Sequence, residues 1–141
     1  MARKVGTASA VTTGALAGAM TLIRLALVPF WRRGATSEFK PWFVDNAPRL
    51  RALMVPLGAA AAATTTVNAL ISRRGRAALA AAAAVGVGVV TMAVNEPLNA
   101  RFAGPDPVEP ADLDRWVRWH DVRVALGLVA AWASAGTTHR S

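Results

Sequence analysis

Long uncharged apolar runs alternate with short charged segments along this chain. Three of the runs cover residues 5–23, 52–72 and 77–95, and each is close to the ~20 residues that a helix needs to cross the hydrocarbon layer of a membrane. A fourth run, over residues 124–138, is too short on its own. It reaches the length of a span when its helix begins near Val117. The pattern therefore predicts four membrane helices.

The composition agrees with a membrane protein of one domain. Hydrophobic residues make up 54% of the 141 residues, which is a high fraction for a soluble chain of this size. We therefore expect an all-α fold, an integral membrane four-helix bundle that residues 1–141 form as a single domain. The expected helices cover about residues 5–31, 48–72, 76–95 and 112–136.

The first loop carries aromatic residues at helical spacing. Ser37 can cap a short helix there, and Phe39, Trp42 and Phe43 then share one face of it. We expect this short interfacial helix to lie in the lipid headgroup layer, where amphipathic helices bury such a face. Its role stays open between a membrane anchor and a lid over a pocket.

A proline and three polar side chains mark the end of the third predicted helix. The residue before Pro97 disfavours the helical conformation, so we expect the helix to end or kink at this point. Asn95, Glu96 and Asn99 would then lie at a helix terminus on the membrane boundary.

The net charge of +8 indicates contact with lipid rather than with nucleic acid. The arginines sit in short clusters at the ends of the apolar runs, which is the arrangement expected from control of membrane topology and from contact with headgroups. The turn over residues 73–76 holds three arginines and no acid, which favours a cytoplasmic position for it. We therefore expect a multi-pass protein of the cell membrane with both termini in the cytoplasm.

Four spans would bring most polar residues of interest to one side of the membrane. The end of the first helix, the start of the second, the end of the third and the start of the fourth share that side, under the aromatic first loop. The residues expected to gather there are Arg24, Asn95, Glu96, Asn99, His120, Asp121 and Arg123.

Arg24 lies about two turns inside the first predicted helix. An arginine at that depth usually faces a polar cavity or a partner carboxylate. The alternative is that its long side chain reaches back to the membrane interface. The sequence leaves both alternatives open.

The start of the fourth helix carries the residues best suited to chemistry. Trp116, His120 and Arg123 lie at i, i+4 and i+7, so they form one stripe, with Trp119 beside it. A histidine close to an arginine and to carboxylates can act as a general base. Tryptophan and arginine are also common at helix entrances, where they form an interfacial belt, so the spacing favours neither role.

The sequence offers few ligands for a metal and no thiol chemistry. It contains no cysteine, and its two histidines, His120 and His139, are expected on opposite membrane faces. His120 with Glu96 or Asp121 would be a thin ligand set for a catalytic zinc or iron centre. We therefore expect no metal site and no bound cofactor.

Several short motifs follow one another in a recognisable order. The most specific are the Asn-x-Pro-x-Asn segment of residues 95–99 and the Trp-His-Arg segment of residues 116–123. The others are Val28-Pro29-Phe30-Trp31, Glu38-Phe39, Trp42-Phe43 and Met54-Val55-Pro56-Leu57. In this order, and over most of the chain, they resemble the anthrone oxygenase-like family of small four-helix integral membrane proteins.

The resemblance implies an enzyme that oxidises anthrones to anthraquinones in aromatic polyketide pathways, without a classical cofactor and with dioxygen as co-substrate. A lipophilic substrate would enter from the bilayer, and His120, paired with Asp121 or Glu96, would remove a proton from it. Arg123 and Arg24 would stabilise the resulting anion. The residues expected to contact the substrate are Arg24, Asn95, Asn99, Trp116, Trp119 and Trp42.

Two other functions stay open at this point. A redox-neutral cyclase or isomerase of natural-product biosynthesis would use the same acid and base residues. A small membrane transporter or accessory subunit would turn over no substrate; the first helix here offers Arg24 where proton-coupled exporters place a carboxylate. The expected partners are a lipophilic small molecule and membrane lipids, and the small-residue helix faces permit a homo-oligomer without requiring one.

Overall fold

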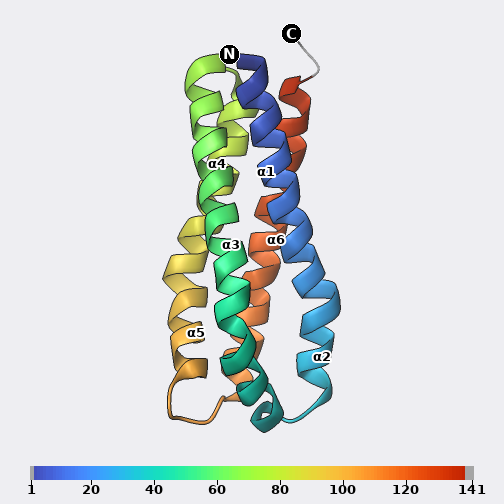
Figure 1. Cartoon of the computed structure of the whole chain (residues 1–141), viewed down its shortest axis with the longest axis vertical. Helices are drawn as coiled ribbons and strands as arrows, with labels where there is room; N and C mark the ends of the chain where they lie inside the picture. Colours follow the sequence, from blue (N-terminus) through green and yellow to red (C-terminus); the bar gives the residue numbers. More distant parts are fainter. Residues whose placement is uncertain (1, 139–141) are drawn as a thin grey trace.

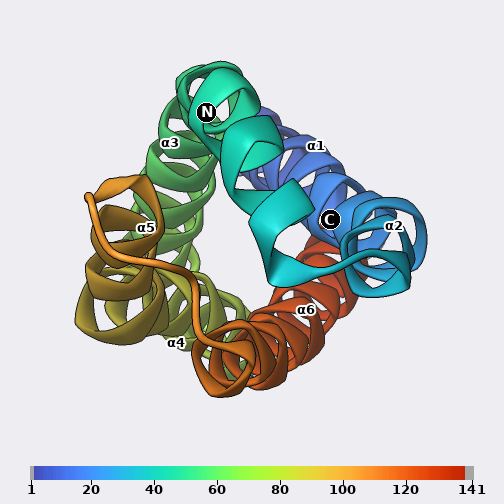
Figure 2. The same ribbon diagram turned by 90° about the horizontal axis from the view of Figure 1, so that it is seen from below.

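The chain forms four long helical rods around a common axis, as seen along the bundle in Figure 1 and from its end in Figure 2. The computed structural model describes residues 2–138. The elements are α1 (Ala2–Leu22), the π-helix η1 (Ile23–Leu27), α2 (Val28–Arg33), α3 (Thr36–Ser72), α4 (Gly75–Val90), the π-helix η2 (Thr91–Asn95), α5 (Glu96–Ala103) and α6 (Pro110–Thr138). This architecture confirms the predicted all-α four-helix bundle.

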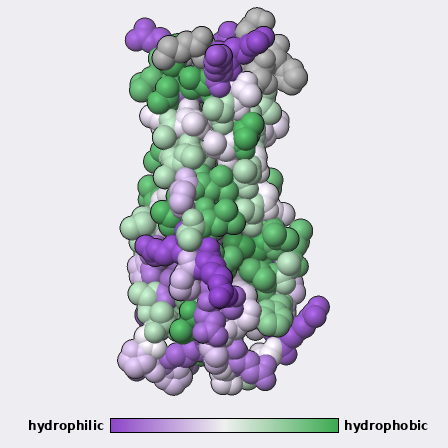
Figure 3. Space-filling model, in the orientation of Figure 1, coloured by the Kyte–Doolittle hydropathy of each residue, from purple (hydrophilic) through white to green (hydrophobic). Residues whose placement is uncertain are grey.

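Three of the rods have the length and apolar character of membrane spans. They cover Ala2–Arg33, Thr36–Ser72 and Gly75–Ala103. On the face drawn in Figure 3, hydrophobic residues cover much of the upper and middle parts, and hydrophilic residues gather lower down and at the top rim. The chain is therefore a membrane protein. The fourth rod, α6, packs along α1 and α4, and a membrane crossing by α6 stays a prediction.

Small residues allow α6 to approach α1 closely. A Cβ atom added at Gly127 would lie 2.4 Å from Cε of Met20 and 3.5 Å from Cα of Ala17. Ala130 and Ala133, one and two turns further along α6, are almost completely buried. Such contacts bring the backbones of membrane helices together and increase their van der Waals packing.

The second rod begins earlier than the sequence predicted. A helix was expected from Pro48, preceded by a separate interfacial helix, but α3 runs without a break from Thr36. Prolines inside it remove backbone hydrogen bonds, and aromatic packing offsets this cost. Phe39 and Phe43 are buried, and their ring centroids lie 5.4 and 5.5 Å from that of Phe102 in α5. The predicted interfacial segment is thus helical, but it belongs to α3 and contributes to the core.

The third rod also continues past its predicted end at Asn95. It passes through η2 and reaches Ala103 in α5. Pro97 has no N–H group to bond the carbonyl of Ala93, four residues earlier, and its ring crowds that carbonyl. The helix responds by widening into a π-helix, in which the N–H of Glu96 bonds the carbonyl of Thr91. The proline therefore changes the helical register without ending the rod.

A proline also follows the π-helix of the first rod. Pro29 has no N–H group to bond the carbonyl of Leu25, four residues earlier, and Leu25 lies within η1. Both π-helices contact α6. Such wide turns change the directions of the side chains that follow them, and they are frequent at functional sites.

Candidate functional site

A cavity of about 830 Å³ lies within the bundle, and every rod contributes to its wall. Most of the wall is apolar, with Leu16, Met20 and Ile23 on the first rod and Leu50 and Met54 on α3. The lining residues with a polar partner come from α3, η2, α5 and α6. They are Arg51, Thr91, Glu96, Asn99, Trp116 and Arg123.

The cavity reaches the apolar outer surface between α3 and the rod of α4 and η2. Val55 on α3 lines the cavity and is 52% exposed, and Met92 on η2 lines it and is 68% exposed. Val85 and Val89 of α4 are lining residues that are exposed in the same way. These exposed side chains form an apolar rim of the cavity between the two rods.

Arg123 is one of two arginines that line the cavity, the other being Arg51. Its Nη1 donates to Oγ1 of Thr91 over 3.2 Å, and its Nη2 lies 2.7 Å from Nδ1 of His120. The guanidinium carbon lies 5.4 Å from the ring centroid of Trp116. Its Nε is buried and has no hydrogen-bond partner. No carboxylate among residues 2–138 forms an ion pair with it.

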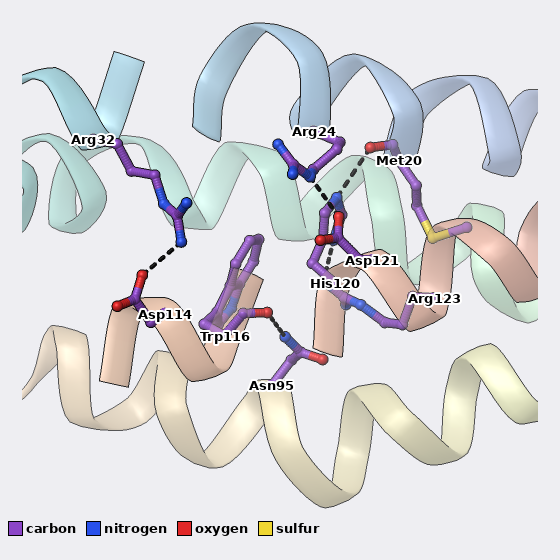
Figure 4. Close-up of polar contacts among 9 residues, drawn as sticks. All are labelled: Met20, Arg24, Arg32, Asn95, Asp114, Trp116, His120, Asp121 and Arg123. Atoms are coloured by element: carbon purple, nitrogen blue, oxygen red, sulfur yellow. Dashed lines mark hydrogen bonds and ion pairs between the residues drawn. The ribbon is translucent and has the colours of Figure 1, made fainter. Parts of the chain in front are cut away.

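His120 lies behind Arg123 and is completely buried. Its Nε2 is 3.0 Å from the carbonyl oxygen of Met20 in α1, and its ring stacks on that of Trp116 with centroids 4.9 Å apart (Figure 4). A carbonyl only accepts and a guanidinium only donates. The contacts therefore identify the neutral tautomer, in which Nε2–H donates to Met20 and Nδ1 accepts from Arg123. His120 is not among the residues that line the cavity.

A second polar chain crosses the cavity wall from α6 to α3. Nε1 of Trp116 donates to Oδ1 of Asn99 over 2.8 Å, and Nδ2 of Asn99 donates to Oε1 of Glu96 over 3.1 Å. The other carboxylate oxygen of Glu96 forms an ion pair with Arg51. The structure thus brings the predicted residues Glu96, Asn99 and Trp116 together and adds Arg51 to them.

Asn95 supports the site from behind. It is completely buried in η2, and its Nδ2 donates to the backbone carbonyl of Trp116 over 3.3 Å (Figure 4). Its Oδ1 is buried without a partner. Asn95 therefore joins η2 to α6 and does not line the cavity.

Besides His120 and Asn95, four other predicted site residues lie outside the cavity wall. Arg24 on η1 forms an ion pair with Asp121 on α6, and the two side chains are 36% and 47% exposed (Figure 4). Trp119 is exposed as well. Trp42 packs on Trp31, with ring centroids 5.3 Å apart. The structure thus pairs Arg24 with a carboxylate, one of the alternatives that its depth in the helix left open.

Sequence reasoning missed two polar residues of the cavity wall. Arg51 belongs, with Arg49, to one of the arginine clusters whose position indicates contact with headgroups, although its place one turn inside the second predicted helix puts it on the same membrane side as Glu96. Thr91 had no signal, because threonine is common in apolar helices. Its role as an acceptor for Arg123 depends on how η2 faces α6.

No group of three or more His, Asp or Glu side chains within residues 2–138 could hold a metal ion. His139, the second histidine considered from the sequence, lies outside the described residues.

Comparisons with known proteins point to one family. A family model described as Anthrone oxygenase matches residues 39–133, which is more than half of the chain. The matched range contains Arg51, Thr91, Glu96, Asn99, Trp116 and Arg123 of the cavity wall. No curated protein and no solved structure matches the chain.

Proposed function

The chain belongs to the anthrone oxygenase family, and on this basis we propose that it is a membrane-embedded biosynthetic enzyme that oxygenates an anthrone-like or other lipophilic aromatic intermediate with dioxygen. The observation that carries the proposal is the guanidinium of Arg123 on the wall of an apolar cavity. Its Nε is buried without a hydrogen-bond partner, and no carboxylate within residues 2–138 forms an ion pair with it.

A cation in such surroundings is costly unless an anion compensates it. Ionised side chains within membrane bundles mark functional sites for the same reason. A substrate that becomes an enolate or phenolate during the reaction would supply the missing negative charge. Arg123 would then stabilise the anion more than the neutral substrate, which is the condition for lowering the barrier.

The cavity suits a lipophilic substrate of moderate size. Its volume of about 830 Å³ falls in the range of small-molecule sites, which are mostly apolar with a few polar groups that set orientation. A polycyclic aromatic molecule would partition into the bilayer and enter between α3 and α4, past Val55 and Met92. Trp116 and Asn99 would line the polar end of the cavity.

The proposed reaction converts a ring methylene into a carbonyl. Removal of one C–H proton leaves a carbanion that the conjugated ring oxygen stabilises. The carbanion transfers electrons to dioxygen, and a C–O bond forms to give a hydroperoxide. Loss of the second C–H proton and cleavage of the O–O bond then give the ketone and water. One dioxygen molecule thus supplies one oxygen atom to the product and one to water, and the substrate is the reductant.

We also propose the orientation of the bundle. Arg3 and Lys4 of α1 and the turn with Arg73 and Arg74 lie at one end of the bundle, and all eight acidic residues lie between Glu38 and Asp121, away from that end. Positive charges in short segments are retained in the cytoplasm. The termini would therefore be cytoplasmic, and the polar end of the cavity would lie towards the other face.

Labelled oxygen tests this function. Protein in lipid nanodiscs is given an anthrone under ¹⁸O₂, and products are analysed by mass spectrometry. We expect one ¹⁸O in the quinone product, and a loss of about 10²–10³-fold in rate for Arg123→Leu. Arg24→Leu removes an arginine from the outer surface at a nearby level and is the matched control. A product of unchanged mass that also forms under nitrogen would replace the oxygenase with a redox-neutral cyclase.

A further inference from the structure

We infer that Glu96, rather than His120, is the catalytic base of this site, and that His120 is a positioning residue that holds Arg123. The inference rests on the proposed function, because it concerns the C–H proton that the oxygenation must remove. It follows from three properties of the two side chains: their free acceptor sites, their access to the cavity and their positions relative to Arg123.

His120 has no acceptor site left. A neutral imidazole has one N–H donor and one nitrogen that accepts. The donor is used by the carbonyl oxygen of Met20, and the acceptor Nδ1 receives a hydrogen bond from Arg123 over 2.7 Å. The ring is also completely buried and stacked on Trp116. To accept a proton from a substrate, His120 would first have to lose Arg123, the cation that stabilises the product of this step.

Glu96 keeps free acceptor sites. An ionised carboxylate has about four lone-pair sites on its two oxygens. Asn99 occupies one on Oε1, and Arg51 occupies one on Oε2. The side chain of Glu96 is 22% exposed and lines the cavity. A substrate C–H group in the cavity can therefore reach a lone pair of Glu96 without breaking an existing contact.

Asn99 orients this carboxylate. The indole Nε1 of Trp116 can only donate, so the amide oxygen of Asn99 must face it and the amide NH₂ must face Glu96. The hydrogen bond from this NH₂ group fixes the position of Oε1 of Glu96 on the cavity wall. Trp116 is itself buried and packs on both His120 and Trp31. The hydrogen bonds from Trp116 through Asn99 to Glu96 therefore start from a rigid side chain.

The positions of the two groups also match the substrate class. In an anthrone the reacting methylene and the oxygen that becomes anionic lie on opposite edges of the middle ring. The base and the cation must therefore face each other across the ring. Glu96 on α5 and Arg123 on α6 both line the cavity without contacting each other directly. His120 contacts Arg123 and would lie at the oxygen end, away from the methylene.

One carboxylate then serves the whole reaction. Glu96 takes the first proton from the methylene and returns it to the peroxide anion that forms when the carbanion combines with dioxygen. It takes the second C–H proton from the hydroperoxide and gives it to the hydroxide that leaves as the O–O bond breaks. Two C–H bonds and one O–O bond break, one C=O group and one water molecule form, and Glu96 ends as a carboxylate.

Hydrogen exchange without oxygen isolates the proposed step. Protein in nanodiscs is mixed with anthrone in D₂O under nitrogen, and deuterium at the methylene is followed by mass spectrometry above the uncatalysed rate. We expect Glu96→Gln to lower catalysed exchange by about 100-fold or more. Formate added to Glu96→Ala should restore part of the rate, since a small carboxylate can occupy the vacated space. His120→Asn, which keeps an acceptor for Arg123, should retain exchange within about tenfold, with a raised KM.

The opposite pattern would overturn the inference: exchange at the intact rate in Glu96→Gln and none in His120→Asn. Equal thermal unfolding of the variants and the intact protein excludes a folding defect, and rescue by formate separates a lost base from a lost contact. Oxygen uptake that Glu96→Gln leaves unchanged would overturn the base assignment alone. Exchange that depends on Glu96 without any oxygen uptake would support the base and refute the oxygenase. An intact protein with neither activity would overturn both.

Discussion

The carboxylate of Glu96 forms an ion pair with the guanidinium of Arg51, and this pair joins α5 to α3 across the cavity wall. The two residues are 45 positions apart in sequence and come from the second and third rods. Arg51 is 61% exposed at its outer side. The pair therefore sits where the cavity meets polar surroundings.

Because Arg51 is exposed, its ion pair should contribute little to stability. We expect Arg51→Met to change the free energy of unfolding by less than about 1 kcal/mol, and to raise the KM for an anthrone while catalysed exchange continues, since the carboxylate remains. Thermal unfolding and substrate titration in nanodiscs would measure both effects. A complete loss of exchange in this variant would mean that Arg51 itself takes part in the chemistry.

Gly127→Ala is expected to displace the side chain of Met20. The new Cβ would meet Cε of Met20, the far end of a flexible side chain, and its next neighbours in Ala17 lie at ordinary contact distance. Met20 can change rotamer, so the overpacking should cost no more than about 1 kcal/mol, which offsets the gain of alanine over glycine in a helix. Gly18→Ala is the matched control, because its Cβ would have no neighbour within 4 Å and it does not line the cavity; alanine there should stabilise α1 by about 0.5–1 kcal/mol. Equal unfolding temperatures for the two variants would contradict this account of the α1–α6 contact.

Pro97 is expected to matter for activity more than for stability. Pro97→Ala restores an N–H group for the carbonyl of Ala93, so the π-turn of η2 can return to α-helical geometry. The residues before and after η2 would then rotate by one position, about 100°, which separates Thr91 from Glu96 on the cavity wall. We expect the unfolding temperature to stay the same or to rise. The oxygenation rate should fall at least tenfold, which corresponds to an increase of about 1.4 kcal/mol in the activation free energy. Full activity in this variant would show that η2 does not set the site.

The entrance between α3 and α4 predicts a steric effect. Val55→Trp places a large ring at the exposed rim of the cavity and should lower kcat/KM for a polycyclic substrate without a change in unfolding temperature. Val11→Trp is the matched control, because Val11 is also an exposed apolar residue, at 64%, and does not line the cavity. Competition kinetics with anthrones of increasing ring number would measure the effect. An equal decrease in both variants would indicate an effect on the membrane and not on entry.

Much of the fold follows from one-dimensional patterns. A run such as residues 77–95 can lie in a membrane only as a helix, because the hydrocarbon layer leaves backbone N–H and C=O groups no partner outside the segment. Element type and approximate number were therefore predictable. The ends were not. Local propensity predicts helix boundaries at Pro48 and Pro97. Packing of Phe39 and Phe43 on Phe102 stabilises α3 before Pro48, and the π-helix η2 lets the third rod continue past Pro97.

The site divides in the same way. Topology along the sequence was enough to place Glu96, Asn99, Trp116, His120 and Arg123 at neighbouring levels of the bundle. It could not decide which of these side chains face the cavity, because this depends on the rotation of each helix about its own axis. Two π-turns and the close contact at Gly127 set those rotations.

The sequence by itself thus determined the class of protein, its helices and the residue types available for chemistry, since these depend on local hydrophobicity and spacing. Only the tertiary structure decided their roles. Contacts between rods join Nε2 of His120 to the carbonyl of Met20 and pair Arg24 with Asp121 on the outer surface, while Glu96 and Arg123 line the cavity wall. Such contacts join residues up to 100 positions apart, and no pattern within one helix contains them.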